Sequence, residues 1–219
     1  MKTIRVTGTG RVTAAPDTIE IPISFSTVSK KYAETVRKDS QKAEEIAALM
    51  EEAGFRKEDL KMRDYQVDTY YESYRDRDGN YKSKFEGYKC SRSFSLQFPK
   101  DMKLLAKAVG ALGQCLNHPE FSIRFMIKNT DDAVSAMLEN AAISAAAKAA
   151  VLCRASGVEL GELQSIDYSW DRINVYSNTR LRKNCLEDMS PDYITSDGLD
   201  FEPENIEISE NVTFIWEVK

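Results

Sequence analysis

An alanine-rich run between residues 131 and 156 constrains the fold of this chain more than any other stretch. The segment reads DDAVSAMLENAAISAAAKAAVLCRAS. Alanine has the highest intrinsic helix propensity, and two aspartates at the start suit the positive end of a helix dipole. Asn129 or Thr130 can cap the first turn, and Gly157 can supply the left-handed residue that ends a helix. We therefore predict one helix over Asp131–Ser156.

One apolar stripe of this helix is expected to pack on a sheet, because its members recur at helical spacing. The stripe comprises Val134, Leu138, Ala141, Ala145, Ala149 and Leu152. A second face carries only small side chains, at Ala142, Ala146, Ala150 and Cys153. Such a face allows close approach of the first helix or of another subunit. Charges are few along the segment, so the helix is expected to have little free surface.

Alternation of apolar and polar residues predicts seven strands, and helical spacing predicts two further helices. The strands are expected near 4–12, 19–25, 60–74, 81–98, 121–128, 160–175 and 206–218, and the further helices near 29–53 and 99–113. The order is ββαββαβαββ. It predicts a single α+β domain over 1–219, with an antiparallel-rich mixed sheet and helices packed on one face. The first two strands are expected to form a hairpin.

Two segments are expected to stand apart from the body. The third and fourth strands exceed the usual five or six residues, and Asp78-Gly79 between them favours a tight turn. A hairpin over about 65–90 should therefore project. The polar stretch over about 178–203 is predicted to be a long loop, and loops of that length in compact domains are either functional or mobile.

Composition excludes several classes of function. The 219 residues carry a net charge of −5, which argues against nonspecific binding to nucleic acid or to anionic membranes. No apolar run reaches the length of a membrane span, so none is expected. The first residues alternate in polarity and lack the apolar region of a secretory signal. A cytoplasmic location is expected, with export after removal of a signal peptide as the alternative.

No catalytic constellation can be found in the sequence. Gly8-Thr9-Gly10 lacks the third glycine of a nucleotide-binding loop, because position 13 is Thr13, and is interpreted as a turn or bulge. His118 is the single histidine, and no G-x-S-x-G motif is present. Asp131-Asp132 is explained by the helix dipole without a metal. The chain is therefore expected to be non-enzymatic, with no catalytic residue, metal site or cofactor.

Tyrosines on the predicted hairpin are the best candidates for a functional surface. The four chosen are Tyr70, Tyr71, Tyr74 and Tyr81, which lie among several Lys and Arg residues. Aromatics among cations can stack on single-stranded nucleic acid, but Asp and Glu are equally frequent here. Tyrosine is also enriched at protein interfaces. Cross-strand packing ranks first, self-association second and nucleic acid last, so a homo-oligomer or a protein partner is expected.

The four cysteines raise a second possibility. None are in CxxC spacing, which indicates reduced thiols rather than a metal site or a redox pair. Cys153 in the long helix and Cys90 on the apolar side of its strand are expected to be packed. Cys185 follows Arg182 and Lys183 in the polar loop and is the candidate reactive thiol. A thiol-based redox sensor, or a small-ligand-binding protein with a cleft beside this loop, are the alternative functions.

Several short motifs, in this order and spacing, resemble the SIMPL-domain family, whose function is unknown. They are Val6-x-Gly8-x-Gly10-x-Val12 followed by Pro16-Asp17-x-Ile19, Phe55-Arg56-x-Glu58-Asp59-Leu60, Gly87-Tyr88, Phe121-x-Ile123-x-Phe125 before the alanine-rich run, Gly157-Val158-x-Leu160-Gly161 after it, and Pro203-Glu204 before Val212-x-Phe214-x-Trp216. The resemblance covers nearly the whole chain. It implies no catalytic residues, and it implies themes of oxidative-stress defence, signalling complexes and the cell envelope.

Overall fold

The computed structural model describes residues 2–76, 79–168, 174–182 and 201–219, and only the backbone of 180–182. Within these residues the order of elements is ββαββαβαβββ, with one short 3-10 turn, η1 (Lys57–Asp59). The fold is α+β, as predicted. The chain divides into two compact units, each drawn from separate stretches of sequence. The first unit comprises Met1–Asp17, Phe125–Thr179 and Pro203–Lys219, and the second comprises Thr18–Arg124 and Arg180–Glu202.

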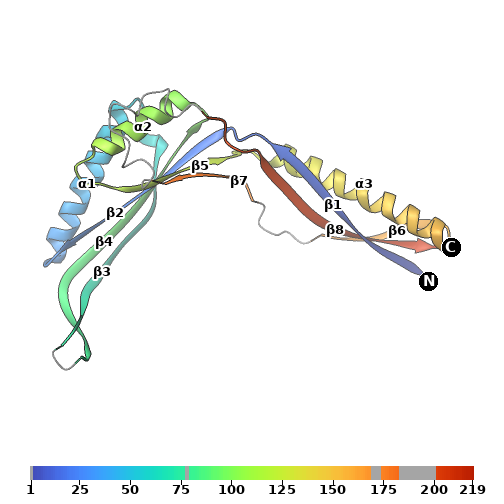
Figure 1. Ribbon diagram of the computed structural model, residues 1–219, viewed down its shortest axis with the longest axis horizontal. Coiled ribbons are helices and arrows are strands. Elements are labelled where there is room, and N and C mark those ends of the chain that lie inside the picture. Colours follow the sequence, from blue (N-terminus) through green and yellow to red (C-terminus); the bar gives the residue numbers. More distant parts are fainter. Residues whose placement is uncertain (1, 77–78, 169–173, 183–200) are drawn as a thin grey trace. The chain divides into compact units, whose positions relative to one another are not determined.

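The first unit is a three-stranded antiparallel sheet covered by one long helix (Figure 1). Its elements are β1 (Thr3–Ala14), β8 (Ile206–Val218), β6 (Leu160–Asp167) and α3 (Asp131–Ser156), with sheet order β1-β8-β6. The helix has the predicted bounds. The Asn129 side chain accepts a hydrogen bond from the backbone N–H of Asp131 at 3.1 Å, and Gly157 ends the helix with φ of 69°. Both expected boundary signals are confirmed.

Small residues on both partners let α3 lie very close to β1. A Cβ added at Gly8 would stand 2.0 Å from the carbonyl oxygen of Ala141, and one added at Gly10 would stand 1.9 Å from that of Met137. Neither contact is sterically allowed, so only glycine fits at these two positions. Gly8 and Gly10 are therefore mid-strand contact points for a helix, and the interpretation as a turn or bulge is wrong.

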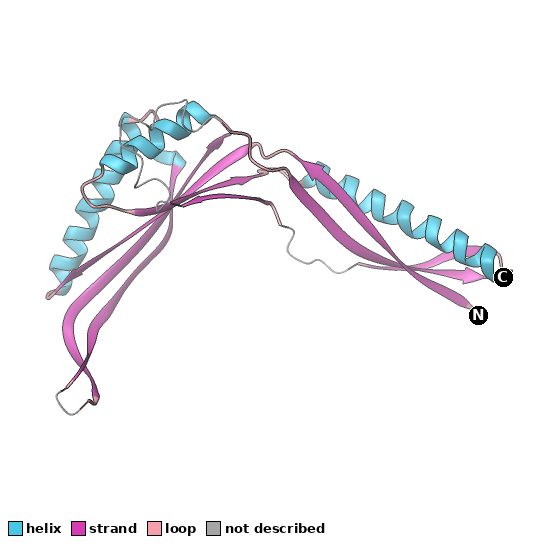
Figure 2. Cartoon of the chain, viewed as in Figure 1, coloured by secondary structure: helices cyan, strands magenta, loops and turns pink. Residues whose placement is uncertain are grey.

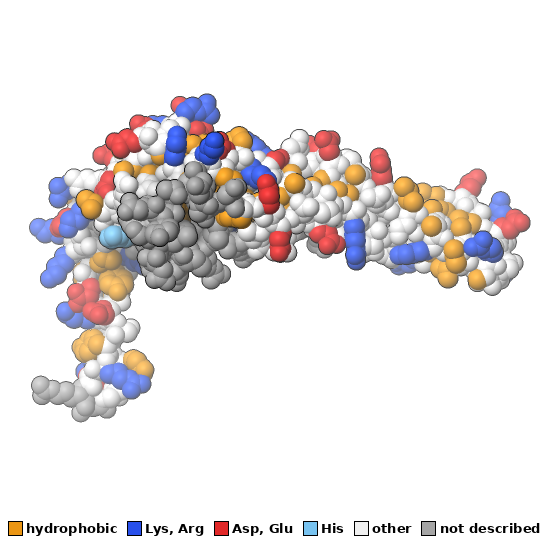
Figure 3. All heavy atoms as spheres, turned by 45° about the horizontal axis from the view of Figure 1, so that its top comes forward, with side chains coloured by type: hydrophobic (Ala, Val, Ile, Leu, Met, Phe, Trp, Pro, Cys, Tyr) orange, Lys and Arg blue, Asp and Glu red, His pale blue; other side chains and the backbone are white. Residues whose placement is uncertain are grey.

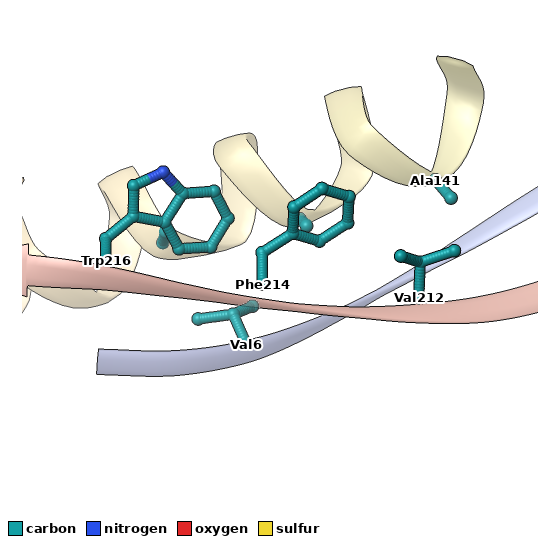
Figure 4. Close-up of a cluster of buried hydrophobic side chains, with 7 residues drawn as sticks. Val6, Ala141, Val212, Phe214 and Trp216 are labelled. Carbon is teal, nitrogen blue, oxygen red and sulfur yellow. The ribbon is translucent and has the colours of Figure 1, made fainter. Parts of the chain in front are cut away.

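Aromatic side chains of β8 fill the space that the alanines leave under α3. Phe214 and Trp216 stack with ring centroids 5.5 Å apart, and both face α3 together with Val6 of β1 (Figure 4). Ala141 and Ala145 are completely buried against them. A flat helix face of alanines thus packs on a strand that carries the large side chains.

The surface of α3 differs from the prediction. Val134, Ala141, Ala145 and Ala149 are buried as expected, but Leu152 is half exposed and Cys153 is buried in its place. The contact stripe drifts around the helix because the underlying strands twist. The opposite side of α3 is open to solvent, so the expectation of little free surface is wrong.

A five-stranded sheet with two helices on one face makes up most of the second unit, and its strand residues 125–126 and 176–179 fall within the stretches assigned to the first unit (Figure 2). Its elements are β2 (Thr18–Ser29), α1 (Tyr32–Glu52), β3 (Leu60–Arg75), β4 (Tyr81–Pro99), α2 (Met102–Gln114), β5 (Glu120–Met126) and β7 (Tyr176–Arg182), with strand order β3-β4-β2-β5-β7. Alternate residues of the strands face the helices. The buried helix-facing set includes Ile19, Ile21, Ile23, Phe94, Leu96, Phe98, Ile123 and Phe125. Asp101 caps α2 by accepting from the N–H groups of Lys103 and Leu104.

The β3–β4 hairpin continues past the strand that supports it. β2 pairs with β4 only as far as Ser29 opposite Tyr88, whereas β3 and β4 remain paired out to Arg75 opposite Tyr81. Residues 70–75 and 81–87 therefore form a two-stranded ribbon beyond the sheet, as Figure 1 shows. The predicted projecting hairpin is confirmed.

Three topological expectations are wrong. β1 and β2 do not form a hairpin, because β1 pairs with β8 and β2 pairs with β4. The strands belong to two sheets rather than one. β6 ends at Asp167 instead of residue 175, and an additional strand, β7 (Tyr176–Arg182), includes the first residues of the loop predicted over about 178–203, of which residues 183–200 lie outside the described ones. Polar side chains on a sheet-edge strand resemble those of a loop, which explains the last error.

Candidate interaction surface and polar clusters

Aromatic side chains form a continuous row along the projecting hairpin. Tyr71 contacts Phe85 with ring centroids 5.5 Å apart, and Phe85 contacts Tyr88 at 5.7 Å. Tyr88 in turn meets Tyr32, at the start of α1, edge to face at 5.6 Å. Edge-to-face pairs of this kind are favourable beyond the area that they bury. The row stiffens the ribbon and anchors its base to α1.

The four predicted tyrosines do not share one face. Tyr71 lies opposite Phe85, and Arg75 lies opposite Tyr81 four residues along, so these pairs point to the same side of the ribbon. Tyr74 lies opposite Lys82 and points to the other side, and Tyr70 lies next to a register shift. Tyr81 is 73% exposed and Tyr71 is 54% exposed. We name the side formed by Tyr71, Phe85 and Tyr81 the aromatic face of the hairpin.

In the described part of the hairpin, most charges are paired within it. Lys82 contacts Asp76 at 3.0 Å, and Lys84 contacts Glu86 at 2.6 Å. Arg75 donates to the hydroxyl of Tyr81 at 2.7 Å, and its guanidinium stacks over the same ring at 4.7 Å. These cations therefore have partners inside the ribbon, which weakens the case for a phosphate backbone as ligand.

A buried ionic cluster lies between α1 and the sheet, and the sequence reasoning missed it. Asp39 of α1 is completely buried and contacts the guanidinium of Arg92 on β4 at 2.5 Å. The same guanidinium stacks on the ring of Tyr65 at 4.6 Å. Thr35, one turn before Asp39, donates to the backbone carbonyl of Lys31 at 3.0 Å. The available signal was a charged residue, Arg92, at an inward-facing strand position between apolar neighbours.

A second carboxylate is buried on the sheet face opposite the helices. Glu20 of β2 accepts hydrogen bonds from Ser95 at 2.9 Å, Gln97 at 3.0 Å and Arg63 at 3.1 Å. Arg124 of β5 approaches the other carboxylate oxygen at 3.9 Å. Three hydrogen bonds and a longer ion pair therefore meet at one carboxylate, which links side chains of four strands.

The described thiols are poorly suited to redox chemistry. Cys90, Cys115 and Cys153 are buried, as expected for Cys90 and Cys153. Burial raises the pKa of the Cys90 thiol, and it also raises the pKa of the Cys115 thiol, which donates to Glu45 at 3.6 Å. A raised thiol pKa lowers the fraction of reactive thiolate. Cys185 lies outside the described residues.

Other candidate chemistry finds no support in the described part of the chain. His118 is exposed and has φ of 44°, in a turn where its N–H donates to the carbonyl of Cys115. Among the residues that the structure describes, no three His, Cys, Asp or Glu side chains are grouped to hold a metal ion. Gly8 and Gly10 lie within strand β1 and pack against α3, so they do not form a phosphate-binding loop.

The open side of α3 carries exposed apolar side chains. Ile143 is 68% exposed and Val151 is 52% exposed, and a shallow apolar depression at the edge between α3 and β1 is lined by Val6, Ala147, Lys148, Val151 and Leu152. Figure 3 shows hydrophobic side chains among Lys and Arg on this part of the surface.

Of the helices in the described ranges, α3 alone is long and apolar enough to cross a membrane, a criterion that core helices of soluble proteins also meet. The absence of a span stays a prediction.

A family model described as SIMPL, protein of unknown function (DUF541), matches residues 4–216. The chain belongs to the SIMPL family. A search of curated proteins gives no match. The match spans both units, from Ile4 in β1 to Trp216 in β8, so the glycine pair and the alanine helix both fall inside the SIMPL region. In this SIMPL chain those motifs have a packing role, because Gly8 and Gly10 admit α3 onto β1.

Proposed function

We propose that this SIMPL protein is non-enzymatic and works by self-association through the aromatic face of its projecting hairpin. One observation supports this proposal above the others. Residues 70–75 and 81–87 extend beyond the sheet as a ribbon that exposes Tyr71, Phe85 and Tyr81 on one side. Exposed aromatics on a rigid support are typical of the centre of protein interfaces.

The properties of the ribbon favour a second copy of the same chain as the occupant. A two-fold interface requires a self-complementary patch, and aromatic rings satisfy this by packing edge to face with their own kind. Among the described residues of the ribbon, Arg75, Lys82 and Lys84 already have partners inside it, so these cations create no strong local field that selects a charged partner. β3 is also an edge strand of its sheet, which leaves backbone groups available beside the aromatic face.

Light scattering coupled to size-exclusion chromatography tests the proposal. The double variant Tyr71→Ser, Tyr81→Ser removes the exposed aromatics of the proposed interface and should weaken this association by roughly a hundredfold, since interface tyrosines often contribute more than ~1 kcal/mol each. Tyr74→Ser, on the opposite side of the same ribbon, is the matched control and should associate like the native chain. Circular dichroism should show equal folding of all three proteins.

Two results would contradict the proposal. The first is a native chain that is monomeric at every concentration reached. The second is equal weakening by Tyr74→Ser, which would show a general effect on the ribbon rather than a contact through one face. The redox-sensor and ligand-carrier alternatives stay predictions, and the candidate thiol for the first, Cys185, can be compared with Cys90 by labelling after mild peroxide.

A further inference from the structure

The outward side of α3 is an unpartnered helix face with a defined pattern. Glu139, Ile143, Ala146, Ala150 and Arg154 are all exposed and recur at spacings of three and four residues, which places them on one side of the helix. Ala147 and Val151 extend the same side. Four of these seven are alanine or valine, so a second helix could approach the α3 backbone closely.

Charge along α3 is divided between its two ends. The acidic residues Asp131, Asp132 and Glu139 all precede Asn140, and the basic residues Lys148 and Arg154 follow it. Lys148 is occupied, because its ammonium group donates to the carbonyl oxygen of Thr7 on β1 at 3.0 Å. Glu139 and Arg154 have no ion-pair partner among the described residues. Two unpaired opposite charges thus flank the apolar middle of the exposed face.

We propose that two copies of this chain pair through α3, antiparallel, about a two-fold axis between Ala146 and Ala147. Residues 139 and 154 are equally distant from that axis, 7.5 positions on either side. At 1.5 Å per residue, each lies about 11 Å from the axis along the helix. Glu139 of each copy then faces Arg154 of the other, and Ile143 faces Ala150.

Charge complementarity favours a second copy of α3 as the partner and favours the antiparallel orientation. A parallel pair would place Arg154 against its own copy and align the two helix dipoles side by side, which is unfavourable. The antiparallel pair forms two equivalent ion pairs and opposes the dipoles. An isologous contact of this kind closes on itself and needs no other partner. It lies in the first unit and goes beyond the hairpin contact, which lies in the second.

Charge reversal tests the pairing in a hairpin background in which Tyr71 and Tyr81 are replaced by Ser. Glu139→Arg places two arginines opposite each other, and Arg154→Glu places two glutamates opposite each other. Each single variant should weaken dimerisation at least about tenfold, because two attractive pairs become two repulsive ones. The double variant Glu139→Arg, Arg154→Glu should restore it. Glu51→Arg, an equal charge change on the exposed side of α1, should have no effect.

Disulfide trapping locates the axis independently of charge. Ala147→Cys brings two thiols together at the proposed axis and should yield a cross-linked dimer on mild oxidation. Ala155→Cys lies 8.5 positions from the axis on the same helix, so its two copies stand about 25 Å apart along the helices, beyond the reach of a disulfide. That variant should remain uncross-linked.

Three outcomes would overturn the inference. They are failure of the double charge reversal to restore dimerisation, equal cross-linking of the two cysteine variants, and monomers that bind phosphatidylserine vesicles through this face. In the vesicle case Arg154→Glu should abolish binding and Glu139→Arg should strengthen it, the pattern expected of a basic apolar surface rather than of paired helices. If the chain dimerises through α3 and the hairpin substitutions leave its association unchanged, that result would contradict the proposed function and not the pairing through α3.

Discussion

At the scale of single residues, the glycine pair and the alanine run are two halves of one contact. A helix normally packs on a sheet at a distance set by its larger side chains. Here Ala141 and Ala145 are completely buried, and Gly8 and Gly10 offer no side chain against them. The backbone of α3 therefore lies almost directly on β1. The alanines of α3 meet this requirement for small residues, and they also give the segment its strong helix propensity.

Replacing Gly8 or Gly10 with alanine tests this contact. The added Cβ would meet backbone atoms of α3 at about half the normal distance, and backbone cannot rotate away. Each substitution should lower the free energy of unfolding by about 3 kcal/mol, at the upper end for overpacked cores. Chemical denaturation monitored by circular dichroism measures it.

The matched control lies in α2. A Cβ added at Gly110 has no heavy atom within 4 Å, so Gly110→Ala should be neutral or stabilise by up to ~1 kcal/mol through helix propensity. A Gly8→Ala protein as stable as the native chain would mean that α3 and β1 can separate without cost.

At the scale of elements, α1 is held on its sheet by a buried charge as well as by apolar packing. Asp39 faces inward from the middle of α1, between Thr35 and Ala43, and forms an ion pair with Arg92. Arg92 is itself held between that carboxylate and the ring of Tyr65. Breaking a buried ion pair from one side leaves an uncompensated charge, whereas replacing both partners often costs little.

A double-mutant cycle on this pair should be strongly non-additive. Arg92→Met leaves Asp39 buried without its cation and should destabilise the protein by about 3–5 kcal/mol. The double variant Asp39→Leu, Arg92→Met should recover most of that loss, because two apolar side chains fill the same site. Urea denaturation of the two single variants and the double variant gives the coupling energy. Additive losses would show that the two side chains act independently.

The helices and most strands could be predicted from sequence because their patterns are local. Residues 131–156 carry helix propensity and both boundary signals, and Ile19 to Phe25 alternate strictly. Pairing is not local. β1 is adjacent in sequence to β2 but pairs with β8, which lies near the other end of the chain. The Asp39–Arg92 contact joins a helix to a strand far along the chain, so neither residue identifies its partner by spacing.

At the scale of the whole molecule, each unit has a buried core of its own. In the first unit Phe214, Trp216 and Val6 pack beneath α3, and in the second unit Ile21, Ile23 and Leu96 lie between the sheet and its helices. Each unit takes up stretches that are far apart in sequence, so the chain passes repeatedly between them. Because each unit has its own core, the two units could unfold independently. The repeated passage of the chain between the units instead favours cooperative unfolding of both.

Hydrogen exchange read by mass spectrometry distinguishes these cases. If the cores open independently, Gly8→Ala should speed amide exchange in β1, β8 and α3 and leave β2 and α1 unchanged. Ile21→Ala should do the reverse, since loss of a fully buried isoleucine costs about 2–5 kcal/mol within its own core.

Fluorescence of Trp216, which is buried in the first core, provides a second readout once Trp170 is replaced by Phe. Its denaturation midpoint should fall with Gly8→Ala and stay constant with Ile21→Ala. We expect this independence because Trp216 packs with Phe214 and Val6 in the cluster under α3, whereas Ile21 lies in the five-stranded sheet. A midpoint that falls equally in both variants would establish one cooperative domain over residues 1–219, which is the organisation that the sequence predicts.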